Sequence, residues 1–93
     1  MSDSWPRLKP NPMYLEILTA EKKVFEGDVT SATFPGSDGS FQILNNHAPL
    51  ISLLAEGTVE YKVNEKRQKV QITGGVVEVL KNKVIVLADG VKE

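Results

Sequence analysis

The chain has 93 residues, 41% of them hydrophobic, and its 11 basic and 12 acidic residues give a formal net charge of −1. This length is typical of one domain with a small core, and the balanced charge excludes a broad electrostatic field for nucleic acid or anionic lipid. Because the chain contains no cysteine, disulfides and cysteine-ligated metal sites are excluded.

The first twelve residues, MSDSWPRLKPNP, are rich in proline, which supplies no backbone donor to a sheet. We therefore predict an irregular arm over 1–12 and a single folded domain over 13–93. The arm lacks the apolar core of a signal peptide and the arginine-rich pattern of a transit peptide. No apolar run approaches the roughly 20 residues that cross a bilayer, so we expect a soluble chain that reaches a membrane only through a partner.

Hydrophobic residues recur with a period of two from Met13 onward, which predicts strands. The first strand covers 14–18 and closes at the Thr19-Ala20-Glu21 turn. In the second segment, Val24 to Phe34, the Gly27-Asp28 pair suggests a tight turn or a bulge. The next predicted strands are Ser40 to Leu44 and Pro49 to Leu54.

The second half of the chain predicts two hairpins. Thr58 to Asn64 and Lys69 to Thr73 flank a loop over Asn64 to Gln68, in which the basic stretch 66–69 is interpreted as a solvated turn. Val76 to Leu80 and Lys83 to Leu87 flank the two-residue connection Lys81-Asn82. No segment shows the 3.6-residue period of an amphipathic helix. These eight or so short strands predict an all-β fold, an antiparallel β-sandwich.

The stretch FPGSDGSFQILNNHAPLI, residues 34–51, combines two clusters of turn residues with the only histidine, His47. Pro35 presets φ, glycines 36 and 39 allow positive φ, and Asp38 can hydrogen-bond its own backbone. No Gly-Lys-Ser/Thr ending of a phosphate-binding loop is present. We expect both clusters to form one end of the sandwich, as a polar tip suited to contact rather than to catalysis.

These residues also allow two other functions. A free-standing enzyme or ligand-binding domain would use His47 with Ser37 or Ser40 and Asp38, but no nucleophile signature surrounds them. A lipoyl- or biotinyl-like carrier domain would be modified on Lys81 at its hairpin tip, although Leu80 and Asn82 replace the usual flanking residues. One histidine with no cysteine predicts no metal site, and no cofactor is expected.

An ordered set of motifs carries a resemblance to a known family. They are Leu15 to Gly27 (LEILTAEKKVFEG), Phe34-Pro35-Gly36, Gly39, Phe41, Ile43-Leu44, His47-Ala48-Pro49-Leu50, Gly57, Val59, Gly74 to Val79, Asn82-Lys83-Val84 and Val86 to Asp89. The set resembles the epsilon subunit of F-type ATP synthases and runs through nearly the whole chain outside the arm.

The resemblance implies a β-sandwich of about ten strands at the foot of a rotary motor driven by protons or sodium ions. It implies a non-catalytic central-stalk subunit that couples the gamma subunit to the membrane c ring during ATP synthesis. The residues implied at the c ring are Ser37, Asp38, Gly39, Ser40, Asn46 and His47. Those implied at the gamma subunit are Thr19, His47, Ala48, Pro49 and Leu50.

Three features depart from the family pattern: Ala20 stands where many members have proline, the proline-rich arm is long, and only 90–93 follow the Leu-Ala-Asp motif. Family members commonly continue there into a two-helix domain. If the chain is complete, we expect coupling without helix-mediated inhibition of hydrolysis and without ATP sensing. The resemblance also implies a peripheral position on the cytoplasmic face of a bacterial inner membrane.

Overall fold

The computed structural model describes residues 13–44 and 47–92. The arm predicted over 1–12 and the predicted contact residue Asn46 therefore lie outside the described residues. Within the described part of the chain no helix is long and apolar enough to cross a membrane.

The all-β prediction is confirmed, because the described residues form ten strands and no helix. In chain order the strands are β1 (Met13–Leu18), β2 (Lys23–Val29), β3 (Ser31–Gly36), β4 (Gly39–Leu44), β5 (Leu50–Leu54), β6 (Gly57–Val63), β7 (Lys66–Ile72), β8 (Gly75–Leu80), β9 (Lys83–Ala88) and β10 (Val91–Lys92).

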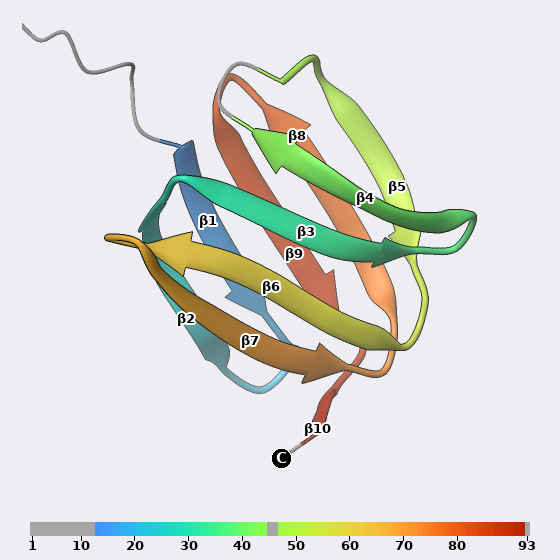
Figure 1. The fold of residues 1–93 in the computed structure, drawn as a ribbon. Coiled ribbons are helices and arrows are strands. Elements are labelled where there is room, and N and C mark those ends of the chain that lie inside the picture. The colour runs from blue at the N-terminus through green and yellow to red at the C-terminus, as the bar shows by residue number, and fades with distance from the viewer. Residues whose placement is uncertain (1–12, 45–46, 93) are drawn as a thin grey trace, which may run out of the picture.

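The strands form one continuous sheet that folds over on itself into two layers. The order is β10-β7-β6-β3-β5-β8-β9-β1-β2, with β4 paired to β3. The two layers join at β3 and β5, which share the single pair Gly36 and Leu54. Figure 1 shows β3, β6 and β7 crossing in front of β1, β8 and β9, which is the arrangement of a sandwich.

Nine strand pairings connect the described strands, and the pairing between β1 and β9 is the parallel one. The sequence pattern predicts strands but contains no information on which distant strands will pair, so the antiparallel prediction did not include this ladder. In the parallel pair Leu15 lies opposite Val84 and Ile17 opposite Val86. All four side chains are fully buried, so the pair brings the first and the last long strand together at the centre of the core.

The core lies between the layers and follows from the alternation of the strands. In β1 every second residue is buried, and the intervening residues face outward. The buried hydrophobic residues are Met13, Leu15, Ile17, Val29, Ala32, Phe34, Ile43, Leu54, Val59, Tyr61, Ile72, Val77, Val79, Val84, Val86 and Ala88. No polar or charged residue among the described residues is buried.

Two hairpins close through two-residue turns. Lys81 and Asn82 have φ angles of 52° and 61°, and Asn64 and Glu65 have φ angles of 50° and 68°. Positive φ at both central positions defines the type I′ turn, whose twist matches that of the flanking strands. The predicted Lys81-Asn82 connection is therefore confirmed.

The predicted loop over 64–68 was too long, because β7 begins at Lys66 directly after a two-residue turn. The basic stretch interpreted as a solvated turn is thus part of an exposed strand. Its residues pair with β6, and the Arg67 Nε lies 2.9 Å from Glu60 Oε2. Cross-strand pairs of opposite charge favour a strand over a loop at this position.

The turn or bulge expected at Gly27-Asp28 is also absent, because β2 continues through both residues to Val29. Gly27 is part of the strand, where its lack of a side chain leaves room for the Phe25 ring. A Cβ at this position would lie 3.2 Å from the Phe25 ring. The small residue lets Phe25 lie along the strand, with its ring centroid 4.4 Å from that of Tyr61 across the layers.

Candidate partner-docking face

The outer surface of the layer β5-β8-β9-β1 carries a group of exposed or half-buried hydrophobic side chains, which we call the apolar face. Its members are Leu18, Ile51, Leu53, Val76, Leu80, Ile85 and Leu87. Ile51 and Leu53 are 71% and 68% exposed. A hydrophobic surface of this kind is typical of an interaction site in a protein of this size.

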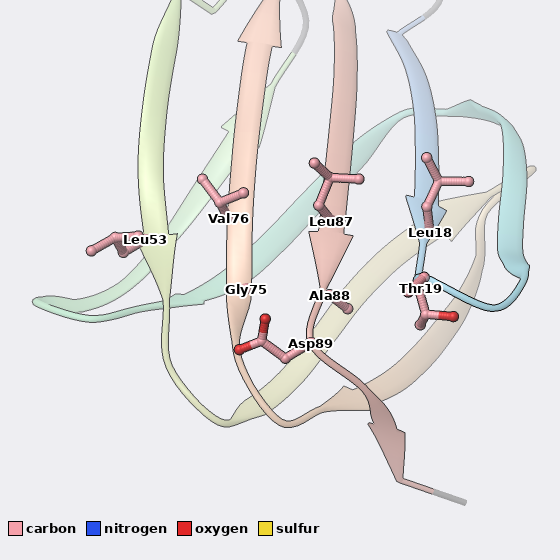
Figure 2. A pocket seen from close by; sticks show the side chains of 9 residues that line it. Leu18, Thr19, Leu53, Gly75, Val76, Leu87, Ala88 and Asp89 are labelled. Carbon is pink, nitrogen blue, oxygen red and sulfur yellow. The ribbon is translucent and has the colours of Figure 1, made fainter.

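Four residues of the apolar face lie side by side across neighbouring strands. Leu53 pairs with Val76, Val76 with Leu87, and Leu87 with Leu18. Figure 2 shows their side chains in a line across the four strands. Neighbouring strands are about 4.8 Å apart, so the row presents a continuous apolar strip to an approaching surface.

A groove of about 490 Å³ lies at the end of this strip, where β1 and β9 end and β8 begins. Its lining residues are Leu18, Thr19, Ala20, Leu53, Gly75, Val76, Leu87, Ala88 and Asp89 (Figure 2). Hydrophobic side chains dominate the lining, with a threonine and a carboxylate at the rim. Such a groove suits an apolar side chain of another protein better than a charged small molecule.

Thr19, predicted from the resemblance to contact the gamma subunit, lies in this groove. Its hydroxyl accepts hydrogen bonds of 3.2 Å from the backbone N–H groups of Glu21 and Lys22. Its backbone N–H donates to the carbonyl of Lys22 at 2.9 Å. These bonds fix the β1–β2 turn and hold the rim of the groove in place.

The sheet becomes charged at its β1–β2 edge. Lys23 Nζ lies 3.3 Å from Glu16 Oε2 and 2.8 Å from Glu26 Oε1. The Tyr14 hydroxyl donates to Glu26, and with Glu16 nearby this raises the pKa of Tyr14 to about 12. Hydrogen bonds from Lys23 and Tyr14 lower the pKa of Glu26 from its ordinary value. The cluster gives the apolar face an ordered, charged border.

The outer surface of the other layer is polar. A shallow pocket of about 210 Å³ is lined there by Ser31, Thr33, Gln42, Glu60, Tyr61, Lys62 and Arg67. Among the described residues of this layer, Leu44 is the one large hydrophobic residue that is exposed. The two outer surfaces therefore differ in kind, and the apolar one is the candidate docking face.

The predicted ring-contact residues Ser37, Asp38, Gly39 and Ser40 lie at the β3–β4 hairpin and are exposed. The Ser37 N–H donates to the Leu53 carbonyl at 3.1 Å, which ties the hairpin to the apolar face. A Cβ on Gly36 would lie 2.6 Å from the Gly39 carbonyl oxygen, so this position requires glycine for space. Of Gly36 and Gly39, only Gly39 has the expected positive φ, which is 125°.

His47, Ala48 and Pro49 are exposed and directly precede β5. The expected second turn cluster, Asn45-Asn46, lies outside the described residues, but the expected polar tip that unites His47 with the β3–β4 hairpin is not formed. Strand β4 separates the hairpin from His47, and its length places them roughly 17 Å apart. Leu50, also predicted as a contact, is half-buried and packs against the core.

The enzymatic interpretation of His47 finds no supporting geometry. Its Nδ1 lies 2.8 Å from the Ala48 carbonyl oxygen, and since a carbonyl only accepts, Nδ1 is the protonated nitrogen and donates. Ser37 and Asp38 lie at the far end of β4. Among the described residues there is also no group of three or more His, Cys, Asp or Glu side chains that could hold a metal ion.

The carrier-domain alternative places its modification on Lys81, and the structure puts this residue at the exposed tip of the β8–β9 hairpin.

The sequence pattern did not predict that Ile51, Leu53 and Leu87 are exposed. The available signal was the lack of alternation in LISLL of β5 and VIVLA of β9. Strands that are apolar on both sides have a second hydrophobic surface to cover.

The described residues thus form a small two-layered β domain with an apolar outer face. Residues 12–93 match the family described as "ATP synthase, Delta/Epsilon chain, beta-sandwich domain". The chain belongs to this family, and the resemblance inferred from its motifs is confirmed.

Curated relatives agree with the family. The chain is 40% identical over 75 residues to the ATP synthase epsilon chain of Leptospira borgpetersenii, covering 81% of this chain and 59% of the relative. It is 45% identical over 78 residues to that of Chlorobium limicola, covering 83% of this chain and 89% of the relative. The chain thus spans about three-fifths of the Leptospira relative and most of the Chlorobium one.

The fold also matches solved structures. A chain in the Euglena gracilis mitochondrial ATP synthase, OSCP/F1/c-ring, aligns with a TM-score of 0.83 over 99% of this chain and 60% of that chain, at 20% identity. A chain in the Tetrahymena thermophila mitochondrial ATP synthase central stalk and c ring aligns with a TM-score of 0.76 over 91% and 69% of the two chains, at 20% identity. At this identity the likeness establishes the fold.

Proposed function

We propose that this chain acts as a non-catalytic rotor subunit of an ATP synthase, joining the gamma subunit to the membrane c ring. The observation that carries the proposal is the apolar face, a continuous strip of Leu18, Leu53, Val76 and Leu87 in a chain of the epsilon family. A subunit that couples two partners by binding needs such a surface and needs no catalytic group.

The gamma subunit is the proposed partner of the apolar face. Thr19 in the groove and the exposed residues His47, Ala48 and Pro49 beside β5 belong to the same layer. The proposed contact therefore extends across the layer from β1 to β5. Burial of a strip of this size supplies the hydrophobic centre that stable interfaces require, with the charged β1–β2 edge as its rim.

The polar loops of the c ring are the proposed partner of the β3–β4 hairpin. Ser37, Asp38, Gly39 and Ser40 offer hydroxyl, carboxylate and backbone groups on a turn held by a bond to Leu53. Because the hairpin begins beside the apolar face, one rigid domain can contact both partners. Asn46 and His47 remain predicted ring contacts, although His47 lies at the opposite end of β4.

The proposed location follows from these partners: the periphery of a bacterial inner membrane on its cytoplasmic side. The proposed role is compatible with an ATP synthase driven by protons or by sodium ions, since it does not require this domain to bind either ion. The ion is chosen by the membrane ring, and the domain transmits rotation.

Co-expression with the gamma subunit of the same organism, followed by size-exclusion chromatography, tests the proposal. We expect a co-eluting complex with one copy of each chain, stable at 150 mM salt because apolar contacts are weakly screened. Two separate peaks at micromolar concentration of both proteins contradict the proposed function. A polar-face variant, Thr58→Lys, serves as a control and should leave the complex intact.

A further inference from the structure

Glu78 lies in the middle of the apolar face. In the sheet it stands between Ile51 of β5 and Ile85 of β9. Val76 and Leu80 are two residues away on β8 and point to the same side. The residues directly opposite this carboxylate on both neighbouring strands and those two positions away on its own strand are thus hydrophobic, and Lys83 of β9, opposite Leu80, is the nearest basic residue in the ladder.

The glutamates that neighbour Glu78 in this layer, Glu16 and Glu26, have a basic partner, whereas Glu78 has no ion pair among the described residues. Glu16 and Glu26 share Lys23, at 3.3 and 2.8 Å. On the opposite layer Glu60 pairs with Arg67, and Glu56 pairs with Lys92. While the face is open to water, solvation stabilises the exposed Glu78 carboxylate.

Docking changes this balance. An apolar surface that covers Ile51 and Ile85 also removes water from Glu78, and an ionised carboxylate without a partner is costly in such a place. The cost disappears when the incoming surface places a guanidinium or ammonium group opposite the carboxylate. The hydrophobic side chains of Ile51 and Ile85 then strengthen the pair, because they exclude water from it.

We propose that Glu78 is the specificity-determining residue of the docking face and pairs with a basic side chain of the partner. The partner surface is therefore apolar with one arginine or lysine near its centre. The inference rests on the proposed docking of the gamma subunit. It adds that the Glu78 carboxylate selects the correct partner and fixes the position in which that partner binds. An apolar surface lacking the cation is rejected, since it leaves Glu78 buried and unpaired.

The test measures the affinity of the full chain for the gamma subunit by calorimetry, for Glu78→Gln, Glu78→Leu and the control Glu60→Gln. Removing one member of a buried charge pair weakens binding by about 30-fold or more. We expect this loss for both Glu78 variants and a change below about twofold for Glu60→Gln. Urea unfolding of the free chains should be nearly unchanged for Glu78→Gln, because Glu78 is exposed with no partner.

The Glu78→Leu variant is decisive. If the partner surface is entirely apolar, it binds Glu78→Leu as tightly as the original chain or more tightly. That result would overturn the inference and leave the docking proposal intact. A charge swap identifies the pair. Glu78→Lys alone should lose binding, and changing one basic residue of the gamma subunit to an acidic one should restore it. Failure of the unaltered chain to bind the gamma subunit removes the proposed function itself.

Discussion

We expect the Leu87→Asp variant to fold and to bind the gamma subunit at least about 100-fold more weakly than the original chain. Leu87 is 51% exposed and lines the groove between Val76 and Leu18. Because docking can bury only the exposed half of Leu87, the substitution removes an apolar contact worth roughly 1 kcal/mol, and it adds a carboxylate whose desolvation costs several kcal/mol. A 100-fold loss corresponds to about 2.7 kcal/mol, which these two effects together exceed.

The control for this prediction is Leu44→Asp. Leu44 is 52% exposed, almost the same as Leu87, but belongs to β4 in the other layer. The two variants make the same chemical change at equal exposure, so their difference reports the docking face. Calorimetry with the gamma subunit measures it, and equal losses for both variants contradict the assignment of the face.

The second large effect is on stability: Gly75→Ala should lower the free energy of unfolding by about 3 kcal/mol or more. Gly75 has a φ of 147°, and a Cβ there would lie 2.2 Å from the Leu87 carbonyl oxygen and 2.9 Å from the Ala88 Cα. These atoms belong to the backbone of β9, so β8 and β9 must separate. Strained backbone and steric overlap in a core ladder are among the most destabilising changes.

Gly39→Ala is the matched control, because Gly39 also has a positive φ, 125°, but nothing lies within 4 Å of a Cβ there. It should cost about 1 kcal/mol, from the backbone conformation alone. Urea unfolding followed by circular dichroism measures both variants. A loss below about 1 kcal/mol for Gly75→Ala contradicts the close approach of β8 and β9 at this position.

Local pattern predicted much of the fold. The alternation in 14–18, 58–64 and 83–87 corresponds to β1, β6 and β9, and Lys81-Asn82 forms the expected turn. Gly27 was misread because its role is to accommodate Phe25, a packing relation that a local pattern cannot contain. The parallel pairing of β1 with β9 joins segments about 70 residues apart, and periodicity specifies strands without specifying their partners.

The docking face was less accessible to sequence reasoning. LISLL in β5 is hydrophobic at nearly every position, so its pattern does not indicate which residues face the core. The fold makes Leu54 buried while Ile51 and Leu53 are exposed. The polar hairpin over Ser37 to Ser40 was predicted from turn chemistry, whereas its place beside Leu53 depends on the meeting of β3 and β5.

Ion pumping in membrane vesicles tests the central claim most directly. The vesicles carry the organism's ATP synthase depleted of its epsilon subunit, and ATP-driven ion uptake is recorded before and after addition of this chain. The proposed role predicts that the added chain restores uptake, because it joins the gamma subunit to the c ring. A chain that binds the gamma subunit but leaves uptake at the depleted level contradicts the coupling role.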